Sequence, residues 1–494
     1  MPDNDQPKSE EKKDDEKKTE AMKKRLEEMV KREWVVTQHT LSLDGRDLSY
    51  HATVGVMPLR NTETDVLEAG MFFTAYTLNG VENLGERPLI FAFNGGPGSA
   101  SIWLHLGALG PKRARMEDEG WMPAPPYRLV DNPHTWLEFA DLVFIDPVGT
   151  GFSRAAEPDL NKKFWCLDGD LKSVGEFIRL YLARSGRWES PIYLAGESYG
   201  TTRAAGLAGH LVERGIGLSG IILVSMVINF QTLDFEQGND LPYAMFLPSY
   251  AAAAWYHGKL PDDLQGRFLH DLIREVTGYA ENEYSAALAK GDNLSADERR
   301  EVASCVARYT GLSEQYADLA DLRINIYRFC KELLRNERRT VGRLDSRFKG
   351  IDATPTSEFV DHDPAYSAIL PPYTMLMNSY VRRELGFETD LEYEALSMAV
   401  NEKWEWERGK FPDTSAKLRD GFTRNPHLRL FVAQGIYDLA TPFYAADYSL
   451  NHMGLDSSFR GSITRQDYEA GHMFYIETNS LAKFREDVAA FVQG

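Results

Sequence analysis

Residues 192–200, Ile-Tyr-Leu-Ala-Gly-Glu-Ser-Tyr-Gly, decide the fold of this chain. The apolar run 192–195 is typical of a buried strand, and the glycines on both sides of Ser198 allow a strand and a helix to pack closely around a tight turn. Small and apolar side chains then recur at helical spacing: Ala204, Leu207, Ala208 and Leu211. The pattern predicts a nucleophile elbow, a strand–turn–helix unit that exposes a serine hydroxyl for attack.

Further apolar runs of strand length lie on both sides of the elbow. They occupy 89–93, 142–145, 221–224 and 430–433. Helical stretches between several of these runs favour a mostly parallel sheet covered by helices on both faces. We therefore predict an α/β protein with the α/β-hydrolase fold. Alternating segments at 34–36, 48–54 and 71–76 indicate antiparallel strands that lead into this sheet.

The interval between the strands near residues 224 and 430 is too long for a loop. Its helix-rich composition predicts an inserted, mainly helical subdomain that caps the site and shapes substrate access. The residues before 33 are charged and poor in apolar side chains, which favours a solvated tail that is disordered or helical. The expected parts are the tail 1–32, the first part of the hydrolase core 33–234, the cap 235–415 and the second part of the core 416–494.

Two candidate partners for Ser198 follow it in the order that α/β-hydrolases use. Asp438 lies just after the apolar run 428–433, and His472 follows in the segment 469–473, Glu-Ala-Gly-His-Met. One histidine among eleven is ordinarily a surface or core residue, so the argument for His472 rests on chain order and loop position. In this interpretation His472 takes the serine proton and Asp438 orients and stabilises the imidazole.

A glycine-rich loop, Asn94-Gly95-Gly96-Pro97-Gly98, directly follows the strand-like run 89–93. Such a loop can aim backbone N–H groups at a tetrahedral intermediate, as the oxyanion loops of esterases do. A plain turn is the alternative. A phosphate-binding loop is excluded, because the Gly-Lys-Ser/Thr signature is missing.

Taken together and in order, these motifs resemble the serine carboxypeptidases of the bacterial type, the carboxypeptidase C or cathepsin A-like enzymes. The resemblance covers the chain from about residue 35 to its end. It rests on the loop 94–98, Ala-Leu-Gly-Pro at 108–111, Asp-Pro-Val-Gly-Thr-Gly-Phe-Ser at 146–153, the Ser198 elbow, the Asp438 loop and Gly-His-Met at 471–473.

The resemblance implies removal of single amino acids from the C-termini of peptides through an acyl-enzyme intermediate. It implies a catalytic triad of Ser198, Asp438 and His472. It also implies an oxyanion hole formed by the backbone N–H groups of Gly96 and Tyr199. No cofactor is expected, and the expected partners are peptides with a free C-terminus.

The same resemblance implies that Asn94, Gly95 and Glu197 hold the terminal carboxylate of the substrate. An ionised Glu197 would repel that carboxylate, whereas a protonated one would donate a hydrogen bond to it. Peptide binding should therefore favour acid unless the site raises the pKa of Glu197. Met473 is expected in the wall around the departing amino acid, with ordinary core filling as an equally open alternative.

The chain departs from the family pattern close to this carboxylate site. Ala92 stands where a tryptophan is usual, Ser99 replaces a cysteine, and Ala108 replaces a frequent glutamate. A second carboxylate beside Glu197 would raise its pKa by like-charge repulsion, so its loss predicts a weaker preference for acid than in relatives that keep the pair.

Two alternative functions remain open from the sequence. An esterase or acyltransferase would use the same triad without needing a free substrate carboxylate. A catalytically silent scaffold would use the charged N-terminal segment to recruit a partner, but the intact set of motifs argues against it.

The composition of the chain limits the classes of partner that it can bind. The net charge of -19 over 494 residues argues against nucleic-acid binding, which needs a basic surface. No stretch approaches the length of a membrane-spanning helix, and no signal peptide is visible. We therefore expect a cytoplasmic protein, or a secreted or periplasmic one if the N-terminus is incomplete. The oligomeric state is left open.

The sequence offers little for a metal site. Cys166, Cys305 and Cys330 lack zinc-ligand spacing, and buried free thiols are favoured over a bond between the last two. The segment Asp361-His362-Asp363 is interpreted as a polar loop, because adjacent side chains rarely converge on one ion.

Overall fold

The computed structural model describes residues 7–43 and 45–494. Its main sheet consists of β1 (Val35–Leu43), β2 (Arg46–Arg60), β3 (Leu67–Leu78), β4 (Leu89–Phe93), β7 (Asp141–Ile145), β8 (Arg154–Ala155), β9 (Ile192–Glu197), β10 (Gly220–Val224), β13 (Arg429–Gly435) and β14 (Ile463–Tyr468). The strand order is β1-β2-β3-β7-β4-β9-β10-β13-β14, and β8 pairs with β3. A separate antiparallel pair joins β5 (Lys112–Ala114) to β6 (Leu129–Asp131).

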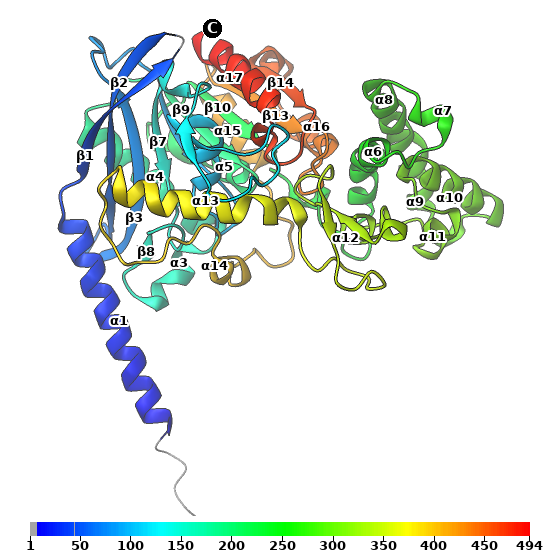
Figure 1. Ribbon diagram of the computed structural model, residues 1–494, viewed down its shortest axis with the longest axis horizontal. Helices are drawn as coiled ribbons and strands as arrows, with labels where there is room; N and C mark the ends of the chain where they lie inside the picture. The colour runs from blue at the N-terminus through cyan, green and yellow to red at the C-terminus, as the bar shows by residue number, and fades with distance from the viewer. Residues whose placement is uncertain (1–6, 44) are drawn as a thin grey trace, which may run out of the picture.

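The sheet has an antiparallel edge and a parallel centre. Strands β1, β2, β3 and β7 pair antiparallel, whereas β7, β4, β9, β10, β13 and β14 pair in parallel. Figure 1 shows the long antiparallel strands on one side of the molecule. The predicted mostly parallel sheet is thus confirmed. Strand β14 was not predicted, because its sequence, Ile-Thr-Arg-Gln-Asp-Tyr, is too polar to read as a buried strand.

Side-chain alternation along the central strands divides the core between the two faces of the sheet. On β4, Leu89 and Phe91 join a cluster with α4 and α5, while Ile90 and Ala92 join another that reaches α17. The helices around the sheet are α2 (Ile102–Leu104), α3 (Asn161–Phe164), α4 (Leu167–Ser185), α5 (Tyr199–Glu213), α15 (Ser415–Arg424), α16 (Phe443–His452) and α17 (Thr478–Gln493). Helices therefore cover both faces, as predicted.

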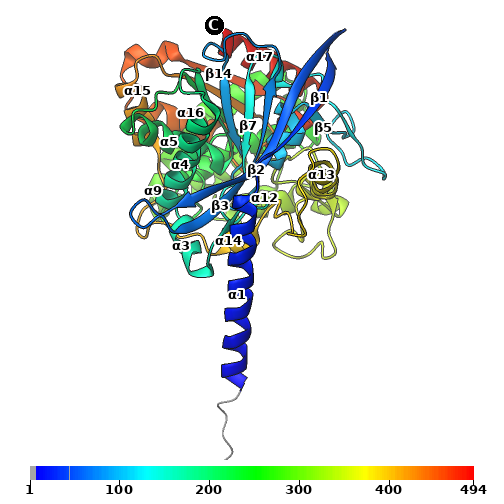
Figure 2. The same cartoon turned by 90° about the vertical axis from the view of Figure 1, so that its left-hand side faces the viewer.

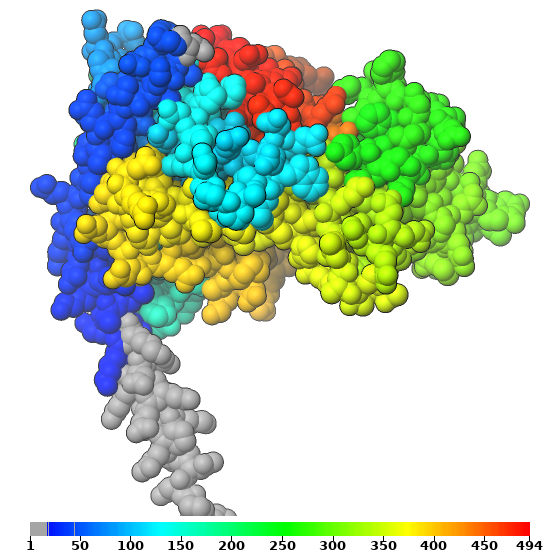
Figure 3. Space-filling model, in the orientation of Figure 1, coloured from blue at the N-terminus to red at the C-terminus, as the bar shows by residue number. Residues whose placement is uncertain are grey.

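A helical insertion follows β10. Its first part lies to one side of the sheet (Figure 1, green; Figure 3), whereas α13 (Pro364–Arg383) runs across the front of the sheet (Figure 1, yellow). Its elements are α6 (Leu241–Tyr256), α7 (Asp262–Gln265), α8 (Leu269–Tyr279), α9 (Ser285–Lys290), α10 (Ala296–Thr310), α11 (Glu314–Leu319), α12 (Ile326–Glu332), the hairpin β11 (Arg339–Val341) and β12 (Lys349–Ile351), α13 (Pro364–Arg383) and α14 (Met398–Glu402). Short 3-10 or π segments are η1 (His105–Leu109), η2 (Trp136–Glu138), η3 (Pro158–Leu160), η4 (Phe230–Thr232), η5 (Ala280–Tyr284), η6 (Gly291–Asn293), η7 (Arg335–Glu337), η8 (Ser457–Ser462) and η9 (Phe474–Ile476).

The insertion packs around a separate hydrophobic core, and the loop after β13 contributes residues to this core. Buried residues of the insertion such as Phe246, Leu272 and Phe329 belong to one cluster with Ile436 and Leu439. Because these last two residues flank Asp438, the packing of the insertion also fixes the position of the loop that carries this acid.

The N-terminal helix α1 (Pro7–Lys31) projects from the body of the molecule (Figure 2). Its last turns are anchored, since Leu26 and Met29 are 1% and 4% exposed. Gly70 on β3 permits this contact, because a Cβ there would lie 2.7 Å from Leu26 Cδ1. Among the described residues, no helix has the length and apolar character needed to cross a membrane.

We predict that Leu439→Ala lowers the free energy of unfolding by about 2–5 kcal/mol, because it leaves a cavity in the shared core. Leu439 is 0% exposed, whereas Leu319, on the surface of the insertion, is 75% exposed. Leu319→Ala is therefore the matched control and should change stability by less than about 0.5 kcal/mol. Urea unfolding followed by circular dichroism measures both, and equal losses in the two variants would contradict the prediction.

Candidate active site

Ser198 lies at the turn between β9 and α5 and has a backbone φ of 59°, a region that side chains other than glycine rarely adopt. The turn is held by close packing of glycine backbones. A Cβ at Gly196 would collide with the carbonyl of Gly200, and one at Gly200 would lie 2.8 Å from the carbonyl oxygen of Phe93. These glycines are required by the close approach, and the result is an elbow that leaves Ser198 half-buried at the edge of a cavity.

Asp438 and His472 come together although 34 residues separate them in the chain. The His472 Nδ1 atom lies 2.7 Å from Asp438 Oδ2. The other carboxylate oxygen of Asp438 accepts the backbone N–H groups of Ala440 and Thr441, and the Thr441 hydroxyl donates to Oδ2 at 2.8 Å. Every oxygen of this buried carboxylate therefore has a donor, and the imidazole is fixed in one orientation.

Ser198 and His472 line the same cavity of about 260 Å³, but no hydrogen bond joins the Ser198 hydroxyl to the imidazole in this structure. In enzymes without substrate this contact is often long, and it shortens in the reacting complex. The described residues around the cavity are Asn94, Gly95, Gly96, Ser99, Trp103, Glu197, Ser198, Arg343, Leu344, Asp363, Tyr366, Ile369, Leu396, His472 and Met473.

The pKa of His472 reflects opposing influences. Burial disfavours the charged imidazolium and lowers the pKa, but the charge and hydrogen bond of Asp438 raise it, so that it lies above its usual value. Glu197 acts in the same direction as Asp438, and Arg343 acts against it. The arrangement stabilises a proton on His472, which is what a base that accepts the serine proton requires.

The glycine-rich loop after β4 lies directly against the elbow. A Cβ at Gly95 would lie 2.6 Å from the backbone nitrogen of Gly200 and would also collide with that of Tyr199. Gly96 has a φ of 101°, which glycine alone adopts without strain. The loop 94–98 and the backbone of the elbow are thus in direct contact.

A buried ion pair fixes the loop relative to α5. The Arg203 guanidinium donates to the Asn94 carbonyl at 2.7 Å and to Asp170 Oδ2 at 2.8 Å. The Tyr199 hydroxyl donates to the same carboxylate oxygen at 3.0 Å. Arg203 and Asp170 could not be predicted from the sequence, because the tertiary fold alone brings β4, α4 and α5 together here.

Asn94 and Glu197 place a donor and a carboxyl group in the cavity beside Ser198. The Asn94 side-chain oxygen accepts the Leu104 N–H at 3.0 Å, while its amide nitrogen is buried and has no hydrogen-bond partner among the described residues. A buried donor without a partner costs free energy unless a ligand satisfies it. This geometry suits a substrate carboxylate.

Glu197 is buried, and burial raises the pKa of its carboxyl group to about 7. Nearby His472, the hydrogen bond from Tyr475 and the neighbouring Asn94 amide lower the pKa, whereas Asp438 raises it. The frequent second glutamate is absent, and Ala108 lies buried in η1. Burial, more than like-charge repulsion, therefore raises the pKa of Glu197 in this chain.

Tyr475 is a residue of this site that the sequence analysis missed. Its hydroxyl donates to Glu197 Oε2, and its ring packs against Gly107 of η1. The only sequence signal was its position three residues after His472. Met473, between them in the chain, is buried and lines the cavity.

The insertion supplies the remaining wall of the cavity. Its contributing residues include Arg343 and Leu344, from the loop between β11 and β12, and Asp363, at the start of α13. Asp363 caps α13 by accepting the N–H groups of Ala365 and Tyr366. The structure thus brings the two parts of the core and the insertion together at one site.

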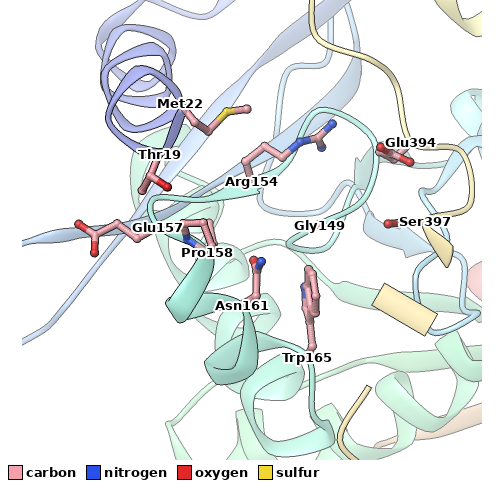
Figure 4. Close-up of a pocket in the computed structure, with 11 residues that line it drawn as sticks. Thr19, Met22, Gly149, Arg154, Glu157, Pro158, Asn161, Trp165, Glu394 and Ser397 are labelled. Atoms are coloured by element: carbon pink, nitrogen blue, oxygen red, sulfur yellow. The ribbon is translucent and has the colours of Figure 1, made fainter. Parts of the chain in front are cut away.

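A larger cavity of about 630 Å³ lies between α1 and the segment that follows β8 (Figure 4). Thr19 and Met22 of α1 approach it from one side, and Arg154 and Trp165 lie on the other (Figure 4). Among the described residues that line it, no histidine accompanies a nucleophile. This cavity therefore lacks the constellation found at Ser198.

No group of three or more His, Cys, Asp or Glu side chains in residues 7–43 and 45–494 is arranged to hold a metal ion. Asp361 accepts the Ala353 N–H, which is a loop contact rather than a ligand arrangement. Cys166, Cys305 and Cys330 are all free.

The chain is similar to known serine carboxypeptidases. A family model described as serine carboxypeptidase matches residues 62–482. Among curated proteins of Arabidopsis thaliana, serine carboxypeptidase-like 13 is 30% identical over 182 residues, covering 36% of this chain and 40% of that protein. Serine carboxypeptidase-like 2 is 33% identical over 135 residues, covering 27% and 29%. The chain thus matches less than half the length of either relative.

Among solved structures, the chain is similar to the crystal structure of Kex1Δp, a prohormone-processing carboxypeptidase from Saccharomyces cerevisiae. The TM-score is 0.56 at 18% identity, and the match covers 90% of this chain and 91% of the other. At this identity the likeness concerns the fold, and it extends over the helical insertion as well as the sheet.

We predict that Gly95→Ala lowers kcat by about 100- to 1,000-fold, because the added methyl group displaces the loop from the elbow and with it an oxyanion donor. Gly217 is the matched control, since a Cβ there meets nothing within 4 Å. Gly217→Ala should retain full activity. Steady-state kinetics on both purified variants checks this, and an active Gly95→Ala enzyme would show that the close contact is not needed.

Proposed function

The chain belongs to the serine carboxypeptidase family, and on that premise we propose that it removes single amino acids from the free C-termini of peptides. One observation carries the proposal: the unpartnered Asn94 amide and the Glu197 carboxyl group both line the cavity that holds Ser198 and His472. A cavity with a nucleophile, a base and a carboxylate-binding end selects a terminal peptide bond.

The proposed reaction begins with attack of the Ser198 hydroxyl on the carbonyl carbon of the terminal peptide bond. His472 accepts the hydroxyl proton, and the N–H groups of Gly96 and Tyr199 hold the oxyanion. The C–N bond breaks when His472 returns the proton to the departing amine. Water then attacks the acyl-enzyme, with His472 again as base, and releases the shortened peptide.

Recognition of the terminal carboxylate is the second part of the proposal. Asn94 and Gly95 would offer N–H donors, and a protonated Glu197 would add an O–H donor. Burial supports this role, because it raises the pKa of Glu197 to about 7 and so keeps the carboxyl group neutral in weak acid. Tyr475, which donates to the other side of Glu197, would fix the direction of that proton.

The proposal is tested with an N-blocked dipeptide and its C-terminal amide. We expect hydrolysis of the free acid at least about 100-fold faster in kcat/KM, since the amide lacks the charge that the site binds. Ser198→Ala should lose the activity. Ser42→Ala, at an exposed position on β1, is the matched control and should keep it. Equal hydrolysis of acid and amide, or hydrolysis of simple esters alone, would favour an esterase or acyltransferase instead.

The pKa of Glu197 gives a pH prediction. Below about pH 7 the carboxyl group is protonated and donates to the substrate carboxylate; above it the ionised group repels that carboxylate. KM for the free acid should therefore rise as pH increases through 7, by up to about tenfold per pH unit. In Glu197→Gln, whose amide donor does not titrate, KM should be constant between pH 5.5 and 8.5.

KM is measured at each pH for both enzymes with the same N-blocked dipeptide. A KM for the unmodified enzyme that stays constant across pH 7, or one that rises equally in Glu197→Gln, would contradict the assigned role of Glu197.

A further inference from the structure

A positively charged side chain of the insertion faces the reacting groups. Arg343, in the loop between β11 and β12, lines the cavity that contains Ser198 and His472. Its charge reaches the imidazole, because it is among the groups that lower the pKa of His472. The reaction proposed above has no use for this cation.

Arg343 is half-buried, and its guanidinium forms no hydrogen bond or ion pair with any other described residue. A neighbouring arginine behaves differently. Arg347, four residues later, is buried and ion-paired with Asp345 at 2.7 Å. The five N–H donors of the Arg343 guanidinium are thus left for a ligand. In a site from which water is displaced, a hydrogen bond to a charged group is strong.

The backbone around Arg343 is fixed to the catalytic groups. The Leu439 N–H donates to the Arg343 carbonyl at 3.0 Å, and the His472 N–H donates to the Leu344 carbonyl at 2.6 Å. The Leu344 N–H in turn donates to Asp363 Oδ2 at 3.0 Å. The loop therefore holds the base of the Arg343 side chain in a set position relative to His472.

Asp363 is the acidic group of the same wall, and both of its carboxylate oxygens already accept hydrogen bonds. Its Oδ1 accepts the Ala365 N–H at 2.9 Å, and its Oδ2 accepts the Leu344 N–H. Three backbone donors, counting that of Tyr366, stabilise this carboxylate as the cap of α13. No ion pair joins it to Arg343 among the described residues, so the guanidinium remains available to an anion from the substrate.

The cavity is small. Its volume of about 260 Å³ is below the range of about 300–1,000 Å³ that is usual for ligand pockets, so it suits one terminal residue rather than a longer segment. With the terminal carboxylate held by Asn94 and Glu197, the side chain of that residue is free to reach the wall that the insertion forms.

We propose that Arg343 binds the side-chain carboxylate of the departing residue, so that the enzyme prefers peptides that end in glutamate or aspartate. This proposal rests on the proposed carboxypeptidase function. It assigns the insertion a role in specificity: the core supplies the chemistry and recognises the C-terminus, and the β11–β12 loop selects the terminal side chain.

The test compares two N-blocked dipeptides that end in glutamate and in glutamine, which have nearly the same shape and differ in charge. We expect kcat/KM to favour glutamate by about tenfold or more in the unmodified enzyme, the usual effect of one charge-assisted hydrogen bond. In Arg343→Gln the ratio should fall to about one. Arg343→Lys keeps the charge and should keep part of the preference, whereas Arg343→Glu should shift it toward C-terminal lysine.

Arg383→Gln, at the exposed end of α13, is the matched control and should leave the ratio unchanged. A ratio near one in the unmodified enzyme, or the same ratio in Arg343→Gln, would overturn the proposal. Equal losses on both substrates in Arg343→Gln would also overturn it, because they would place Arg343 on the terminal carboxylate. If dipeptides ending in leucine are cleaved while the glutamate preference is missing, only the specificity proposal fails; if no free-acid peptide is cleaved, the proposed function fails with it.

Discussion

The contact between two backbone turns is the constraint on which the whole site depends. The loop after β4 lies so close to the elbow that only glycine fits at 95, and the elbow holds Ser198 at a φ of 59°. Neither turn is stable in that form alone, so the parallel strands β4 and β9 and the buried pair of Arg203 and Asp170 must impose it. The proposed oxyanion donors, the proposed nucleophile and the proposed carboxylate-binding end share this one scaffold.

The proposed reaction needs opposite protonation states of the two buried ionisable groups beside Ser198. His472 must be neutral to accept a proton, and its pKa is raised by Asp438 despite burial. Glu197 must be protonated to donate, and burial raises its pKa to about 7. The proposed mechanism therefore needs a pH high enough to deprotonate His472 and low enough to protonate Glu197. Because the frequent second glutamate is absent, the upper pH limit of the proposed activity depends on the burial of Glu197 and on its contact with Tyr475.

The sequence predicted the residues of the site that belong to recognisable motifs, His472 included, and missed those that tertiary packing alone brings to the cavity. Ser198, Asp438 and the loop 94–98 each come directly after an apolar run, so motif and strand pattern support each other. Tyr475 and Arg343 have no such local pattern, and only tertiary packing brings them to the cavity. Strand β14 was missed for a related reason, because an edge strand that buries few side chains carries polar residues.

A crystal structure of the Ser198→Ala variant with a bound N-blocked dipeptide, at a pH below 7, tests the account most directly. We predict the terminal carboxylate within hydrogen-bond distance of the Asn94 amide and Glu197, and the scissile carbonyl oxygen at the N–H groups of Gly96 and Tyr199. A peptide bound in the opposite direction, or with its carboxylate away from Glu197, would contradict the account.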